Sequence, residues 1–114
     1  MENLSIPPVE AYFSDYVQEA KKKEANLVGV NGIMQFDFRP SNDGVIVIRI
    51  ENGEIKPLER EYVENATMTI RVPYPDFYKV KNGQEKFWKL LLFRKVKISG
   101  DKTFTKKLGA AGIN

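Results

Sequence analysis

The sequence contains no cysteine and no histidine among its 114 residues. Without cysteine, the chain has no disulfide, no thiolate nucleophile and no cysteine-based zinc site. Without histidine, it lacks a Ser-His-Asp triad, the usual catalytic zinc sites and the most common general base at neutral pH. An enzyme of this composition would depend on carboxylates, lysine, tyrosine, serine or threonine. No motif points to such chemistry, so we predict no catalytic residue, no metal site and no cofactor.

Long apolar runs are absent as well, because no uninterrupted run is longer than the four residues of Leu90–Phe93. A membrane-spanning helix needs about 18 or more. Residues 1–5 show no basic segment followed by an apolar stretch, so we expect no signal peptide. These observations predict a cytoplasmic protein.

Apolar residues make up 42% of the chain, which is enough for one hydrophobic core. The length fits a single domain, and no linker, internal repeat or low-complexity segment divides the sequence. We therefore predict one domain over residues 1–114.

Charge is distributed unevenly along the chain. Residues 1–78 carry 13 acidic and 8 basic side chains, whereas residues 79–114 carry 10 basic and 2 acidic ones. Such an excess indicates an anionic partner, although lysines on solvated helix and strand faces explain it about equally well. Our candidates for contact with anionic headgroups or a membrane surface are Lys86, Lys89, Arg94, Lys95, Lys97, Lys102, Lys106 and Lys107.

Hydrophobic periodicity predicts an α+β domain. Helical spacing predicts helices over 7–22, from Pro73 to about residue 81, over 84–93 and over 102–108, where Gly109 is expected to end the last one. Alternation predicts strands over 28–38, 45–51, 54–60, 65–72 and 94–99. The first three strands are expected to be antiparallel, and the helical crossover between 65–72 and 94–99 favours a parallel pair. We predict a mixed five-stranded sheet with its helices packed on one face.

The helix predicted over 84–93 is apolar nearly all round. Its apolar residues are Phe87, Trp88, Leu90, Leu91, Leu92 and Phe93. A helix of this kind is expected to be covered on more than one side.

Two carboxylates on predicted strands, Asp37 and Glu51, could meet across a hairpin as an acid–base pair. Polar residues on the outer face of a strand are routine, however, and the pair has no further support. We therefore predict that the protein is not an enzyme.

Several segments follow one another in a recognisable order. The strand Asn65–Ile70 precedes a short helix at Asp76–Val80, a turn at Asn82–Gly83, a basic strand at Arg94–Asp101 and a last helix that closes with Thr105–Leu108. Upstream, Met34–Phe38 and the hairpin around Asn52–Gly53 fit the same pattern. In this order the sequence resembles the sterol carrier protein type 2 (SCP-2-like) family. The resemblance covers about residues 28–108, with an N-terminal amphipathic helix in 1–27 and a tail in 109–114.

The resemblance implies a small lipid-binding domain with an apolar tunnel between its sheet and helices. We therefore predict a non-catalytic lipid-binding or lipid-transfer domain whose partner is an acyl or isoprenoid chain, with acyl-CoA and sterol-like ligands included. The candidate residues of the tunnel wall are Met34, Phe36, Met68, Ile70, Phe87, Trp88, Leu91, Leu92, Phe104 and Leu108.

Two other functions are open at this point. Bulky Phe87, Trp88 and Phe93 could fill the tunnel and leave a ligand-free scaffold or interaction module that supports lipid-metabolising enzymes. The basic C-terminal third also interleaves lysines with Phe87, Trp88, Phe93 and Phe104, and these aromatic rings could stack on nucleic-acid bases. Aromatic residues at helical spacing are far more often part of a core, so we do not expect a nucleic-acid partner. The sequence is compatible with a monomer or a homodimer.

Overall fold

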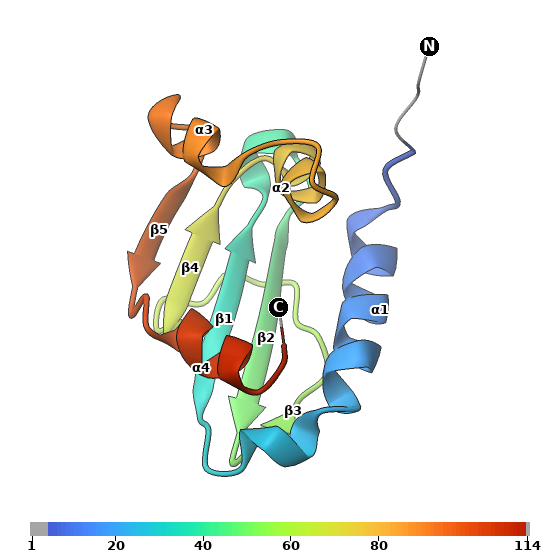
Figure 1. The fold of residues 1–114 in the computed structure, drawn as a ribbon, viewed down its shortest axis with the longest axis vertical. Helices are drawn as coiled ribbons and strands as arrows, with labels where there is room; N and C mark the ends of the chain where they lie inside the picture. The colour runs from blue at the N-terminus through green and yellow to red at the C-terminus, as the bar shows by residue number, and fades with distance from the viewer. Residues whose placement is uncertain (1–4, 114) are drawn as a thin grey trace.

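The computed structural model describes residues 5–113; residues 1–4 and 114 of the predicted domain lie outside this part. Figure 1 shows a twisted sheet with helices lying across it. In chain order the elements are α1 (Val9–Lys21), η1 (Glu24–Leu27), β1 (Gly32–Asp37), η2 (Arg39–Ser41), β2 (Val45–Glu51), β3 (Glu54–Ile55), β4 (Met68–Arg71), α2 (Tyr74–Lys81), α3 (Phe87–Leu92), β5 (Lys97–Gly100) and α4 (Phe104–Ala110).

The five strands form one mixed sheet in the order β3-β2-β1-β4-β5. The predicted α+β class, the mixed five-stranded sheet and the helices on one face are confirmed. The predicted parallel pairing of the last two strands is wrong, because β4 and β5 are antiparallel and the parallel pair is β1 with β4. The reason is the position of the crossover. Helices α2 and α3 both lie at the end of the sheet where β4 ends (Figure 1), so β5 begins at that end and runs back beside β4.

One face of the sheet carries the main hydrophobic core. Helix α1 buries Val9, Phe13, Val17 and Ala20, which recur at helical spacing along one side. They pack against alternating apolar side chains of the sheet, which include Met34, Phe36, Ile46, Ile48 and Ile50. Helices α2, α3 and α4 add Tyr74, Leu90, Phe104 and Leu108 to the same cluster.

The opposite face of the sheet is covered by the segment 56–67, and it buries polar groups. The Gln35 amide nitrogen donates to the Val63 carbonyl at 3.0 Å, and its oxygen accepts from the Val63 N–H at 2.8 Å. The Asp37 carboxylate accepts from the Arg39 guanidinium at 2.9 and 2.8 Å. That hydrogen bond lowers the pKa of Asp37. Both of these buried polar side chains are thus hydrogen-bonded, which is the condition for burial without a large free-energy cost.

The carboxylate pair considered from the sequence does not form. Asp37 lies opposite Val45 at the first residue of β2, whereas Glu51 is the last residue of that strand and pairs with Glu54. The two carboxylates therefore lie at opposite ends of β2.

The helix expected over 84–93 differs most from its prediction. Helix α3 covers only Phe87–Leu92, and Leu90 is its single buried residue. Arg94 ends the helix with a φ of 57°, and the Lys95 N–H donates to the Leu90 carbonyl at 2.8 Å. We expected neighbouring elements to cover this helix on more than one side. Within residues 5–113 they cover only the side that carries Leu90.

Other boundaries shift for local reasons. The first strand begins at Gly32 rather than at residue 28, because Gly29 adopts a φ of 79° in the preceding turn. The strand expected over 54–60 contracts to β3 and one bridge between Glu59 and Val47. Gly109 does not end α4, which continues to Ala110 before Gly112 takes a φ of 86°.

Candidate functional site

A cavity of about 240 Å³ lies between the sheet and the helices. The floor consists of Met34, Phe36 and Ile70 from β1 and β4, which project from the face that carries the core. The remaining wall comes from α1, α2, α4 and the tail. These residues are Tyr16, Phe77, Lys81, Thr105, Leu108 and Ile113. A small void of about 10 Å³ continues beneath α1 between Val17 and Ile50.

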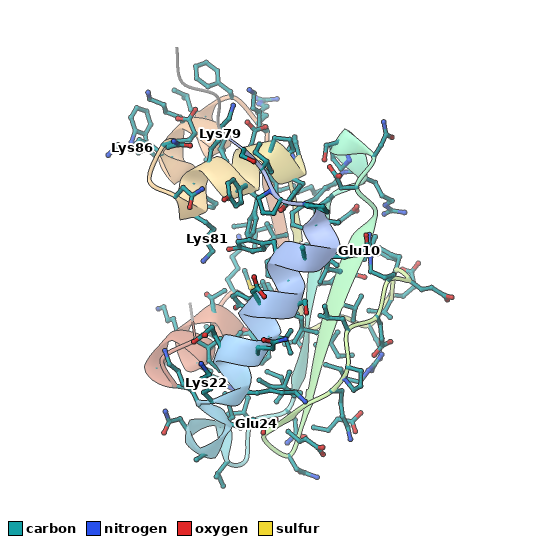
Figure 2. The ribbon with its side chains drawn as sticks, turned by 90° about the vertical axis from the view of Figure 1, so that its right-hand side faces the viewer. Glu10, Lys22, Glu24, Lys79, Lys81 and Lys86 are labelled. Atoms are coloured by element: carbon teal, nitrogen blue, oxygen red, sulfur yellow. The ribbon has the colours of Figure 1, made fainter. Side chains whose placement is uncertain are left out.

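Polar groups at this cavity are few. The Lys81 side chain extends from the end of α2 towards α4 (Figure 2), and desolvation by neighbouring protein atoms lowers the pKa of its ammonium group. Burial raises the pKa of Tyr16 to about 12, with a smaller contribution from Tyr12, so this hydroxyl stays protonated at neutral pH. Thr105 donates its hydroxyl to the Lys102 carbonyl at 2.9 Å. The cavity is therefore apolar with one ammonium and two hydroxyl groups at its wall.

A second hollow, of about 460 Å³, lies between α1 and α2. Tyr12, Tyr16 and Tyr78 line it together with the carboxylates of Asp15 and Glu19. Tyr16 borders both spaces, so its ring forms part of the partition between them.

The structure brings four of the ten predicted wall residues to the cavity, namely Met34, Phe36, Ile70 and Leu108. Two others belong to the packed core, where Met68 and Phe104 are 3% and 1% exposed. The remaining four lie on α3 with their side chains exposed to solvent, and they do not line the cavity. These residues are Phe87, Trp88, Leu91 and Leu92.

Five lining residues were not among the sequence candidates: Tyr16, Phe77, Lys81, Thr105 and Ile113. Helical spacing in the sequence could have indicated three of them, Phe77, Lys81 and Thr105. Phe77 and Lys81 are four residues apart on α2, and Thr105 and Leu108 are three apart on α4, so each pair shares a helix face. No pattern marks Ile113, which lies beyond the last helix.

All eight basic candidates are exposed, and they separate into two groups along β5. Lys86, Lys89, Arg94 and Lys95 flank α3, whereas Lys102, Lys106 and Lys107 lie before and within α4. Figure 1 places α3 and α4 at opposite ends of β5, and Lys97, the first residue of that strand, belongs with the group at α3. The basic residues therefore do not form one continuous surface.

Comparison with protein families settles the relationship that this architecture suggests. The model of the SCP-2 sterol transfer family matches residues 13–111, from within α1 to the end of α4. The chain belongs to the SCP-2 family. Membership supports a sterol- or lipid-binding or transfer domain in the general sense.

Solved structures show the same fold. The sterol carrier protein domain 2 of Helicoverpa armigera superposes with a TM-score of 0.64 at 21% identity, covering 97% of this chain and 96% of that one. Sterol carrier protein 2 from Yarrowia lipolytica gives a TM-score of 0.58 at 14% identity, over 99% and 100% of the two chains. No curated protein sequence matches the chain.

A larger enzyme contains the same fold. The sec-alkylsulfatase Pisa1 from Pseudomonas sp. superposes with a TM-score of 0.57 at 20% identity, over 79% of this chain. The chain spans only 14% of that enzyme's length. SCP-2 domains are generally non-catalytic lipid-binding domains, although some are parts of enzymes.

Two further findings concern residues 5–113 alone. No group of three or more acidic side chains is placed to hold a metal ion. None of the helices in this range combines the length and apolar character that crossing a bilayer requires.

Proposed function

We propose that the chain is a non-catalytic carrier that holds a single acyl or isoprenoid chain in the cavity beneath α1, α2 and α4. The observation that carries this proposal is the cavity of about 240 Å³, which is mostly apolar and lined from the sheet, three helices and the tail. Pockets of this kind, with few polar groups at defined places, are typical of small-molecule sites.

The size of the cavity supports a chain rather than a ring system. Pockets for drug-sized ligands have volumes of about 300–1,000 Å³. A cavity just below that range suits a flexible chain, whose methylenes can enter one after another, better than a rigid sterol. Ten buried methylenes contribute about 8 kcal/mol before the costs of association, so a dissociation constant near the micromolar range is the tightest that ten methylenes alone would give.

The polar groups at the wall support a ligand with an acidic or polar head. Lys81 can pair with a carboxylate or phosphate, and the protonated Tyr16 hydroxyl can donate to the same oxygen atoms. No chemical step is required of them. In this proposal they orient the head while the chain occupies the apolar floor over Met34 and Phe36.

Native mass spectrometry of the freshly purified chain tests the proposal, followed by solvent extraction and lipid mass analysis. We expect a stoichiometric adduct that is lost on denaturation. Thr105→Phe, which fills the cavity from an exposed position of α4, should lower the affinity for a fluorescent acyl probe about tenfold. The control Lys106→Phe adds the same ring at the next position, outside the cavity, and should leave the affinity unchanged.

A ligand-free scaffold that supports lipid-metabolising enzymes is the second function. It is favoured by the limited cavity volume, since aromatic Phe36 and Phe77 already occupy part of the space between sheet and helices. An apo mass without an adduct, and no binding of the acyl probe, would exclude the carrier function and leave this second function in its place. The expected cytoplasmic location stays a prediction, which fractionation of the source cells tests.

A further inference from the structure

Helix α3 presents an apolar surface that the fold does not use. Phe87, Trp88, Leu91 and Leu92 follow the spacing i, i+1, i+4 and i+5, so they share one side of the helix. Their exposed fractions are 41%, 58%, 49% and 65%, and the following Phe93 is 67% exposed. We call these five residues the α3 apolar face.

The α3 apolar face is unlike the rest of the described surface. The other large hydrophobic residues that are exposed within residues 5–113 are Val28 and Tyr62, which lie far from α3 in the sequence and from each other. Five such residues on one short segment are a contiguous patch, and contiguous patches mark a surface that another molecule covers.

Positive charge surrounds the α3 apolar face. Residues 82–96 contain four basic side chains, namely Lys86, Lys89, Arg94 and Lys95, and a single acidic one, Glu85. The Lys89 ammonium lies 5.9 Å from the centre of the Trp88 ring. Figure 2 shows Lys79 of α2 and Lys86 at this same end of the molecule, whereas Lys22 and Glu24 lie at the opposite end.

The backbone at Arg94 strengthens this picture. Arg94 has a φ of 57°, a left-handed conformation that glycine adopts without a steric penalty. An arginine there accepts backbone strain and adds a cation beside the α3 apolar face. Non-glycine residues held in this region of conformational space often occur at functional surfaces.

We propose that the α3 apolar face docks onto a lipid bilayer that contains anionic headgroups. Tryptophan, phenylalanine and leucine on one side of a helix, with lysine and arginine around them, is the arrangement of segments that lie in the membrane interface. The same positive charge opposes packing of this face against a second copy of the chain. The docking surface is distinct from the cavity, so it goes beyond the proposed carrier function.

Vesicles provide the test. The chain is mixed with vesicles of phosphatidylcholine alone or of phosphatidylcholine with phosphatidylglycerol, and binding is measured by flotation. We expect binding to the anionic vesicles that weakens at high salt, because screening reduces the attraction between lysines and headgroups. Trp88 is the single tryptophan, so a blue shift of its emission reports contact at α3 itself.

Paired variants locate the surface. Leu92→Ser with Phe93→Ser should weaken vesicle binding at least about tenfold, whereas Val28→Ser, which changes an exposed apolar residue elsewhere, should leave it unchanged. Lys89→Glu with Lys95→Glu should have a similar effect. The control Lys102→Glu with Lys106→Glu carries the same change in net charge near α4 and should stay within about twofold of the original chain.

Three results would overturn the proposal: no binding to anionic vesicles at low salt, equal losses in the α4 control and the α3 variant, or vesicle binding without a change in Trp88 emission. A dimer that Leu92→Ser with Phe93→Ser converts to a monomer would assign the face to self-association instead. The acyl-probe affinity of the α3 variants should be normal, and Thr105→Phe should still bind vesicles. The carrier function and the docking surface can therefore fail separately.

Discussion

The chain contains two groups of aromatic side chains with opposite surroundings. The first, which we call the aromatic core, joins α1, α2 and β1 through Tyr12, Phe13, Phe36, Phe38, Tyr74, Phe77 and Tyr78, with ring centres 4.9 to 6.4 Å apart. The second consists of Phe87, Trp88 and Phe93, which belong to the α3 apolar face and are exposed. Both groups include aromatic residues of short helices, α2 and α3, so sequence composition does not separate them.

The difference between the two groups lies in what surrounds each helix. Helix α2 lies over the sheet close to α1, so Phe77 contacts Phe13, Phe36 and Phe38. Helix α3 lies beyond that layer at the end of the sheet (Figure 1), and only Leu90 reaches the core. The rings of the aromatic core therefore stabilise the fold, whereas the rings of the α3 apolar face are available for contact with another molecule.

The largest effect is expected for Phe13→Ala in the aromatic core. Phe13 is fully buried and lies next to five other aromatic rings, with ring centres 4.9 to 5.8 Å apart. Removal of a buried phenylalanine ring costs about 3–5 kcal/mol of unfolding free energy. Urea denaturation followed by circular dichroism measures the loss. If Phe13→Ala does not fold, Phe13→Leu should show a smaller loss, and a loss below about 1 kcal/mol in Phe13→Ala would contradict the packing described here.

A smaller effect is expected for Tyr74→Phe, which removes one hydroxyl from the same core. The Tyr74 hydroxyl donates to the Pro7 carbonyl at 2.7 Å and connects α2 to the segment before α1. Loss of this hydrogen bond should cost about 1 kcal/mol. Tyr78→Phe, which removes a hydroxyl from a partly buried ring of the same helix, is the control and should cost less.

The Tyr74 hydroxyl also predicts a dependence of stability on alkaline pH. Burial raises the pKa of Tyr74 to about 12 in the folded chain, from 10.0 for an unperturbed tyrosine. The neutral hydroxyl therefore contributes fully below pH 10, and the contribution is lost as the pH rises from about 10 to about 12. Tyr74→Phe should lose less stability over this interval than the original chain does. An identical pH profile for both chains would show that Tyr74 titrates normally.

Arg94→Gly is expected to raise stability while it weakens the α3 surface. Glycine relieves the left-handed strain at this position, although it is more flexible in the unfolded state, so the gain should be at most about 1 kcal/mol. Arg94→Ala removes the same charge without relieving the strain and should show no gain. Thermal unfolding of the three chains makes the comparison, and equal stability of the glycine and alanine variants would exclude strain at residue 94.

Much of the sheet could be predicted from the sequence. The second strand was expected over 45–51 and has those bounds, because its run of β-branched residues ends at the Asn52–Gly53 turn, which fixes the register with β3. The apolar positions of α1 followed from their spacing. Met34 and Phe36 were among the predicted wall residues, and they line the cavity because alternate residues of β1 face the helices.

The remaining features depend on positions in space that local patterns do not encode. The antiparallel pairing of β4 with β5 depends on the position of α2 and α3 at one end of the sheet, and the helical pattern of the sequence does not encode that position. The exposure of α3 was not predicted because apolar content alone does not show whether neighbouring elements can cover a helix. Lys81 reaches the cavity only because α2 and α4 face one another across it, and a lone lysine at a helix end is otherwise a solvated residue.

The smallest effect is expected for Phe93→Ala, which removes a ring from the α3 apolar face. Phe93 is 67% exposed, so its loss should change the unfolding free energy by no more than about 0.5 kcal/mol. Set against about 3–5 kcal/mol for Phe13→Ala, this result would separate aromatic residues that stabilise the fold from those that do not. The variant should bind anionic vesicles more weakly all the same, because the ring contributes apolar area to docking. A loss of more than about 2 kcal/mol would mean that α3 packs against the core in solution, and the case for a docking surface would then fail.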